Sequence, residues 1–176
     1  LVSVCLAGCS KIDESAQPTP RPTFSSRVVT SGLEYPWEIT WGPDGHLWIT
    51  ERVGQRIVRV NPEDGTRSVA VQVAGVYQAV AQDGVLGMAL HPELLGGTGN
   101  DFVYVGYTYD ADPGPDAFPR NAIRRYTYDS ETETLGEPQE LITGLSAHND
   151  HLGGRLAYGP DDKLYFTVGD QGSNWL

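Results

Sequence analysis

Residues 146–156, with the sequence SAHNDHLGGRL, place two of the chain's four histidines beside an aspartate in one short loop. A neutral imidazole accepts protons near physiological pH because its ordinary pKa is close to ~6.5. His151 is the stronger candidate for a proton acceptor, because Asp150 precedes it and Gly153 and Gly154 follow. In an extended segment Asp150 and His151 would point to opposite faces, so Asp150 orients the imidazole only if the loop bends. Asp150 could otherwise bind a substrate hydroxyl on its own, and a merely solvated surface turn is the alternative for the whole loop.

Metal binding and nucleophilic catalysis find little support in the sequence. His148 and His151 are three residues apart, but no cysteine or glutamate is near them, which argues against zinc. Residues 110–117, DADPGPDA, contain three carboxylates without the spacing and terminal glutamate of a calcium-binding loop, so we expect a solvated acidic loop. A Gly-x-Ser-x-Gly motif is absent from the sequence. We therefore expect no metal ligand in this chain.

The elements that must position the histidine loop are hairpins built around one recurring motif. Residues 38–51, EITWGPDGHLWITE, have apolar and aromatic runs on both sides of Pro-Asp-Gly, which favours a tight reversal between two strands. Residues 155–170 repeat this arrangement closely, and residues 87–109 repeat it with a longer turn. Residues 56–73 and 122–142 each indicate a further strand pair after the first two of these hairpins.

The repeating unit therefore has about four strands, and the second strands of the hairpins begin 56 and 61 residues apart. This period, in a chain with few helix signals, predicts an all-β fold of β-propeller blades rather than a sandwich. Propellers close with roughly 4 to 8 blades, so we expect this chain to be an incomplete part of about two and a half blades. Such a fragment would leave one blade face bare and would be poorly stable alone.

Two loops are expected at equivalent places, each just before the first strand of a blade: residues 80–92 and residues 148–160. Both contain polar side chains followed by glycine and an apolar strand, and the first contains Gln82. Glycine at such points permits unusual dihedrals or a close approach of a ligand to the backbone. Because propeller ligands usually lie near the central axis, we expect these loops to contribute to one site.

The 176-residue chain has the length of one domain and a formal net charge of −11. Such an acidic chain repels phosphate backbones, so nucleic acid is not an expected partner. Four tryptophans and nine tyrosines supply apolar area for a core, and no apolar run approaches the ~20 residues of a membrane-spanning helix.

The N-terminal segment has the composition of a targeting signal and a tether. Residues 1–9 are expected to be a truncated signal peptide whose final Leu-Ala-Gly-Cys resembles a bacterial lipoprotein processing site, with Cys9 as the lipidated residue. An ordinary secretory signal cut nearby is the alternative. We expect residues 10–26 to be a Pro-rich linker and residues 27–176 to be the propeller part, which then contains no cysteine because Cys5 also precedes it. The expected location is periplasmic or extracellular, with membrane contact only through the anchor.

The loops and hairpins from about residue 31 to 176 together resemble the soluble quinoprotein glucose dehydrogenases and the related PQQ aldose sugar dehydrogenases. The resemblance rests on WGPDGHLWITER, RIVRVNPEDG, QDGVLGMALHP, IRRYTYDSETETL and NDHLGGRLAYGPDDKLYFTVGDQGSN, in this order. Its most specific part is a joint set of short matches: Gln82 before Gly84, Asp150-His151 before Gly154-Arg155, and Gly-Asp-Gln-Gly at 169–172.

The resemblance implies a six-bladed propeller that uses pyrroloquinoline quinone (PQQ) and calcium to oxidise aldose sugars at C1 to lactones. By position, His151 matches the general base, which removes the proton of the anomeric hydroxyl while hydride leaves C1 for the C5 carbon of PQQ. Gln82 and Asp150 match residues that hydrogen-bond the sugar, and Asp170 matches an acid near the site. The family's PQQ-binding residues and calcium ligands lie in later blades. We therefore expect this chain alone to bind no PQQ and to oxidise no sugar, and we expect the intact enzyme to need an external electron acceptor.

Two departures leave the substrate and function open. Trp175 stands where the glucose dehydrogenases tend to have a polar residue at the sugar's rim, and HLGGRL leans toward the aldose dehydrogenase branch, so the preferred sugar is undecided. The alternative function is a lipid-anchored propeller that binds sugars or a protein partner without turnover, since fold does not determine function. A hydrolase or lactonase propeller would need converging metal ligands that this sequence does not clearly display.

Overall fold

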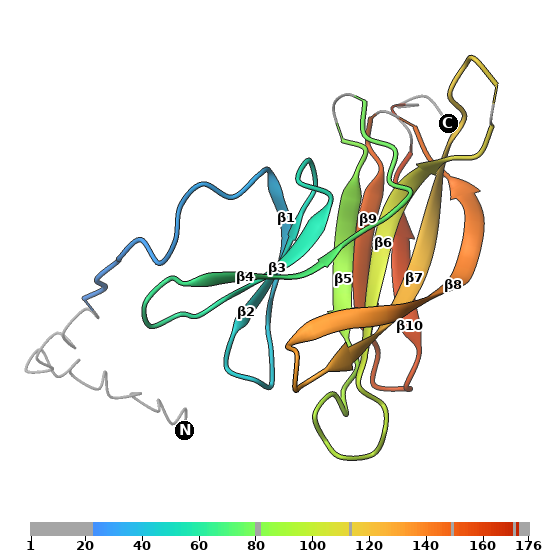
Figure 1. The fold of residues 1–176 in the computed structure, drawn as a ribbon. Coiled ribbons are helices and arrows are strands. Elements are labelled where there is room, and N and C mark those ends of the chain that lie inside the picture. The colour runs from blue at the N-terminus through green and yellow to red at the C-terminus, as the bar shows by residue number, and fades with distance from the viewer. Residues whose placement is uncertain (1–22, 80–81, 113, 149, 171, 173–176) are drawn as a thin grey trace, which may run out of the picture.

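The computed structural model describes residues 23–79, 82–112, 114–148, 150–170 and 172. The predicted signal peptide with Cys5 and Cys9, most of the predicted linker, and Trp175 lie outside these residues. The described residues form three antiparallel sheets (Figure 1). The first sheet contains β1 (Pro36–Trp41), β2 (Leu47–Glu51), β3 (Arg56–Val60) and β4 (Arg67–Gln72). The second contains β5 (Val85–Leu90), β6 (Phe102–Asp110), β7 (Pro119–Asp129) and β8 (Thr134–Ser146), and the third contains β9 (Gly153–Tyr158) and β10 (Leu164–Val168).

This topology confirms the all-β prediction of two four-stranded blades followed by the first hairpin of a third. In each blade the strands pair in chain order, β1-β2-β3-β4 and β5-β6-β7-β8, and β9 pairs with β10. The part of the chain that the structure describes has no helix long and apolar enough to cross a bilayer.

The recurring Gly-Pro-Asp motif closes two of the hairpins in the same way. Between β1 and β2, the Asp44 carboxylate accepts a hydrogen bond from Trp48 Nε1 at 3.0 Å, and between β9 and β10 Asp161 accepts one from the Tyr165 hydroxyl at 2.9 Å. A side chain on the glycine before the proline would collide with this aromatic ring: a Cβ at Gly42 would lie 2.3 Å from Trp48 Nε1. The motif is therefore a turn in which an aspartate holds the aromatic residue four positions later.

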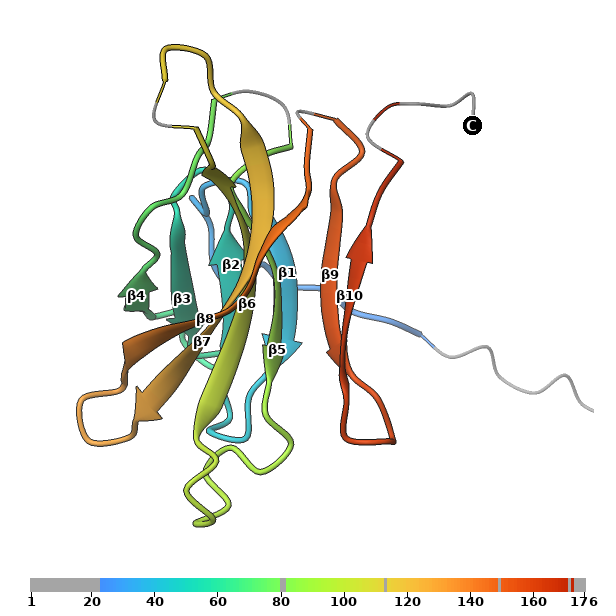
Figure 2. The ribbon, with the colours of Figure 1, turned by 90° about the vertical axis from the view of Figure 1, so that its right-hand side faces the viewer.

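The first strands of the three sheets lie beside one another, in the order β1, β5, β9 (Figure 1). A buried cluster that includes Trp48 and Ile57 of the first blade and Met88 and Val103 of the second joins the two complete blades. A second cluster, which includes Leu156, packs the third hairpin on β5 and β6. As a consequence, the loops that lead into β5 and β9 emerge at the same end of the molecule, the upper end in Figures 1 and 2.

Candidate active site

The loops that lead into β5 and β9, which we expected to contribute to one site, meet through Gln82. Gln82 Nε2 donates a hydrogen bond to Asp150 Oδ1 at 2.8 Å, and Gln82 Oε1 accepts one from the backbone N–H of Leu152 at 3.3 Å. One amide side chain therefore holds two residues that flank His151. The two loops are 68 residues apart in the sequence and are brought together only by the packing of the blades.

The loop at His151 bends. This bend is what allows the neighbouring side chains of Asp150 and His151 to lie on one side of the loop. His151 has a φ of 48°, in the left-handed region, and its backbone N–H donates to the Asp150 carboxylate at 2.9 Å. Leu152, the residue after His151, anchors the bend, because its side chain is fully buried in a cluster with Leu86 and Ala147. The apolar residue thus anchors the loop while the imidazole next to it stays at the surface.

The partner that orients the imidazole is Asp170, which follows β10. His151 Nδ1 lies 2.8 Å from Asp170 Oδ1, and the same oxygen accepts the backbone N–H of Gly172 at 3.1 Å. The chain passes close to itself here, since a Cβ on Gly169 would lie 1.6 Å from the carbonyl oxygen of His151. The β9–β10 hairpin therefore supplies both the imidazole and its carboxylate.

This geometry determines which nitrogen of His151 is available for chemistry. When Nδ1–H donates to Asp170, the neutral ring presents the lone pair of Nε2. Nε2 lies 3.7 Å from Asp150 Oδ2, so Asp150 flanks the proton-accepting side of the ring without a direct hydrogen bond to it. The hydrogen bond with Asp170 and the charges of Asp150 and Asp170 raise the pKa of His151, and the His151 hydrogen bond lowers the pKa of Asp170. The arrangement is that of a base with an orienting acid.

The site is an open corner whose polar groups are an amide, two carboxylates and an imidazole. The side chains of His151, Asp150 and Asp170 are 44%, 50% and 47% exposed. Among the described residues, the hydrogen bonds and ion pairs of this corner include no lysine or arginine. These groups can bind a hydroxyl group and accept its proton, which is what the oxidation of an alcohol requires. The carboxylates of PQQ require cations, which these groups do not supply.

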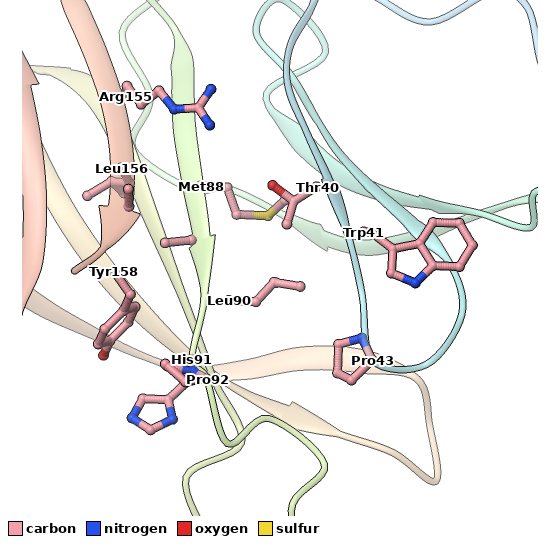
Figure 3. A pocket seen from close by; sticks show the side chains of 12 residues that line it. Thr40, Trp41, Pro43, Met88, Leu90, His91, Pro92, Arg155, Leu156 and Tyr158 are labelled. Carbon is pink, nitrogen blue, oxygen red and sulfur yellow. The ribbon is translucent and has the colours of Figure 1, made fainter. Parts of the chain in front are cut away.

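A separate cavity of about 490 Å³ lies between β1, β5 and β9, further along the strands (Figure 3). Its lining includes Trp41, Met88, Leu90 and Tyr158, with Arg155 at the end nearer the His151 loop. None of the four predicted site residues lines this cavity. The cavity is thus distinct from the polar corner.

The structure brings all four predicted site residues together and adds details that the sequence did not reveal. Gln82, Asp150, His151 and Asp170 form one hydrogen-bonded group, while His148 is exposed three residues earlier. Sequence reasoning considered Asp150 as the residue that orients His151, but the contact to Nδ1 comes from Asp170. It also missed an ion pair between Glu38 and Arg155, although aligning the hairpins at their Gly-Pro or His-Pro steps puts both residues at the same repeat position.

Four-stranded antiparallel units repeated along the chain, with an imidazole–carboxylate pair at the entrance to their first strands, define a β-propeller protein with a candidate proton-accepting site. Residues 33–175 match the family model described as Glucose / Sorbosone dehydrogenase, and the chain belongs to this family.

Known proteins similar to this chain include quinoproteins. Quinoprotein glucose dehydrogenase B of Acinetobacter calcoaceticus is 42% identical over 156 residues, which cover 87% of this chain and 32% of that protein. The PQQ-bound aldose sugar dehydrogenase of Streptomyces coelicolor matches with a TM-score of 0.71 and 33% identity, over 83% of this chain and 41% of that structure. Human Hedgehog-interacting protein is 24% identical over 91% of this chain and 24% of its own length. The chain thus spans about a third of the curated quinoprotein that it matches.

Proposed function

We propose that this chain forms the substrate side of a PQQ-dependent dehydrogenase that oxidises an aldose at C1 to the lactone. The observation that carries the proposal is the short contact of His151 Nδ1 with Asp170, which leaves Nε2 as a proton acceptor beside Asp150. Membership in the Glucose / Sorbosone dehydrogenase family and the similarity to quinoprotein glucose dehydrogenase B support the reaction class.

In this proposal the residues of the chain accept the proton of the sugar hydroxyl and orient the sugar. The anomeric hydroxyl donates to His151 Nε2, and its proton passes to the imidazole as the C1–O bond becomes a carbonyl. Asp170 stabilises the imidazolium that forms, because its carboxylate already accepts the Nδ1–H at 2.8 Å. Asp150 accepts a hydrogen bond from a sugar hydroxyl, and Gln82, which donates to Asp150 at 2.8 Å, supports Asp150 in this role. A base positioned in this way contributes typically about 10²–10⁴-fold to the rate.

The cofactor supplies the oxidising power. When bound, PQQ would supply the acceptor for the hydride that leaves C1, and calcium would supply Lewis-acid activation of that acceptor. We place the residues that would hold the PQQ carboxylates outside the described corner, because that corner offers carboxylates rather than the cations that they require.

The test uses the full-length gene product reconstituted with PQQ and calcium, with dye reduction measured over a panel of aldoses. We expect His151→Ala to lower kcat by about 10²–10⁴-fold, as loss of a general base does. His148→Ala is the matched control, because it removes an exposed imidazole from the same loop, and it should keep the wild-type rate. A His151→Ala enzyme at the wild-type rate would remove the mechanism.

The second candidate function is binding without turnover. The similarity to Hedgehog-interacting protein, which is named for an interaction, is the observation that favours it. The same reconstitution separates the two functions: a binding module would retain saturable sugar or protein binding and would reduce no dye with any aldose.

A further inference from the structure

An ion pair joins the first strand of the first blade to the first strand of the third hairpin. Arg155 Nη1 on β9 lies 3.2 Å from Glu38 Oε1 on β1, although β5 lies between these strands. Figure 3 shows the Arg155 side chain extending from β9 across β5. The Glu38 side chain is only 7% exposed, whereas that of Arg155 is 69% exposed. An exposed arginine thus neutralises a buried carboxylate that comes from two blades away.

Gly87 of β5 is the residue over which this ion pair forms. Glu38, Gly87 and Arg155 each lie five residues before the proline that begins the following turn. A Cβ on Gly87 would lie 2.2 Å from the carbonyl oxygen of Gly154 and 2.9 Å from the Cα of Arg155. The backbones of β5 and β9 therefore touch at this point, and the missing side chain leaves room for Arg155 to reach β1.

Arg155 is well placed to hold the residues that carry the candidate chemistry. Between His151 and Arg155 the backbone passes through Gly153 and Gly154, with φ values of 71° and 89°, so this stretch has little side-chain restraint of its own. The backbone N–H of Arg155 donates at 3.0 Å to Thr167 Oγ1 on β10, three residues before Asp170. A restraint at Arg155 thus acts on both strands whose ends carry the imidazole and its carboxylate.

We propose that the Glu38–Arg155 ion pair positions the β9–β10 hairpin on the first blade and thereby keeps His151 and Asp170 aligned with Gln82. Arg155 is a positioning residue, because it acts through the hairpin rather than on the substrate. Small displacements of reacting groups are costly, since about 1 Å of misplacement can lower a rate by about 10²-fold. The kinetic part of this inference rests on the proposed function, whereas the structural part does not.

The experiment compares four variants of the full-length protein by hydrogen–deuterium exchange and by steady-state kinetics. Arg155→Met removes the cation, Glu38→Gln removes the carboxylate charge, and Arg155→Lys keeps the charge. Lys163→Met is the control, because it removes a cation that pairs with Asp161 at the other end of the same hairpin. Exchange is followed in peptides that contain Leu152 and Gly169, whose backbone N–H groups are hydrogen-bonded within the site.

We expect Arg155→Met and Glu38→Gln to speed exchange in the site peptides by about tenfold while the peptides of β2 and β3 keep their wild-type protection. We also expect kcat to fall about tenfold with KM changed less than about twofold, a partial recovery in Arg155→Lys, and no change in Lys163→Met. The effects of the two changes should not add in the double variant Glu38→Gln/Arg155→Met, because both changes break one interaction.

Wild-type exchange at the site in Arg155→Met would overturn the proposal, and so would an equal increase in every blade, which would indicate a general loss of stability. If the wild-type protein oxidises no sugar, the proposed function fails, and the exchange results alone still decide whether the ion pair positions the hairpin.

Discussion

At the scale of single residues, the proposed chemistry depends on the environment of the imidazole of His151. The hydrogen bond to Asp170 raises the pKa of His151, with the charge of Asp150 as the second cause. A higher pKa makes the neutral ring a stronger base but leaves less of it neutral at a given pH. Below this raised pKa the ring is protonated and accepts no proton, so we expect the proposed activity to rise as the pH rises through it.

Asp170→Asn tests this balance. Without the carboxylate the pKa of His151 falls back toward its ordinary value, so the rising limb of kcat/KM should move to lower pH. The plateau should fall by about 10²-fold or more, because an asparagine amide holds the imidazole in the wrong tautomer and does not stabilise the imidazolium. The measurement is the pH dependence of kcat/KM of the full-length protein.

Asp161→Asn makes the same charge change at the far end of the hairpin. We expect the rising limb of its kcat/KM profile to stay at the wild-type pH. If the rising limb of the kcat/KM profile of Asp170→Asn stays at the wild-type pH or moves to higher pH, Asp170 does not control the ionisation of His151.

At the scale of elements, the β9–β10 hairpin is the unit that carries the proposed base, His151, and the carboxylate of Asp170 that orients it. Its turn is held by Asp161 and Tyr165, and its open end is held by the close contact between Gly169 and the backbone of His151. The loop into β5 then adds Gln82 from the neighbouring blade. The site is therefore shared by two sheets, and its alignment depends on how closely their backbones approach.

Gly169→Ala should misalign the site. Its Cβ would lie 1.6 Å from the oxygen and 2.6 Å from the carbon of the His151 carbonyl, and both are backbone atoms that cannot rotate away. We expect kcat to fall about 10²-fold and the free energy of unfolding to fall by about 1–3 kcal/mol. Kinetics and denaturant titration of the full-length protein measure the two effects.

Gly136→Ala in β8 is the matched control, because a Cβ there has no heavy atom within 4 Å. Equal behaviour of the two alanine variants would mean that the contact at Gly169 does not constrain the site.

At the scale of the whole molecule, Arg59 of β3 links the two complete blades. Its side chain is 1% exposed and lies 2.7 Å from Asp44 in the β1–β2 turn and 3.0 Å from Glu133 in the β7–β8 turn. The guanidinium carbon also lies 5.5 Å from the ring centroids of Trp48 in the first blade and Tyr128 in the second. One buried cation thus joins charges and aromatic rings from both sheets.

Arg59→Met should weaken this junction. The change leaves the nearly buried Asp44 without its cation, so we expect the free energy of unfolding to fall by about 3–5 kcal/mol, with a smaller loss for Arg59→Lys. Arg67→Met, which removes an exposed arginine from the adjacent strand, should cost less than about 1 kcal/mol. Chemical denaturation checks both values, and a similar loss in the two methionine variants would contradict the role of Arg59.

The acid dependence of this junction has a definite sign. Burial by itself raises the pKa of Asp44, but hydrogen bonds from Trp48 and Arg59 outweigh burial and lower that pKa. The stabilisation from Asp44 is therefore complete above its ordinary pKa and is lost as the pH falls through the lower, folded-state value.

The sequence by itself determined the elements and the residue types of the site. Pro-Asp-Gly turns between alternating aromatic and apolar runs predict hairpins because these signals are local: the turn residue, its glycine and the aromatic partner lie within seven positions, as in residues 42–48. The same locality made His151 and Asp150 visible as neighbours in one loop. The candidate roles of Gln82 and Asp170 came from the family resemblance rather than from the residues alone.

Only the tertiary structure decided which groups contact one another. Three contacts of this kind join residues that are 19 to 117 positions apart in the sequence. Asp170 rather than Asp150 accepts from His151 Nδ1, and Gln82 donates to Asp150. Arg155 reaches Glu38 across Gly87. No sequence pattern encodes those contacts, because they result from how the side chains of whole sheets pack against one another.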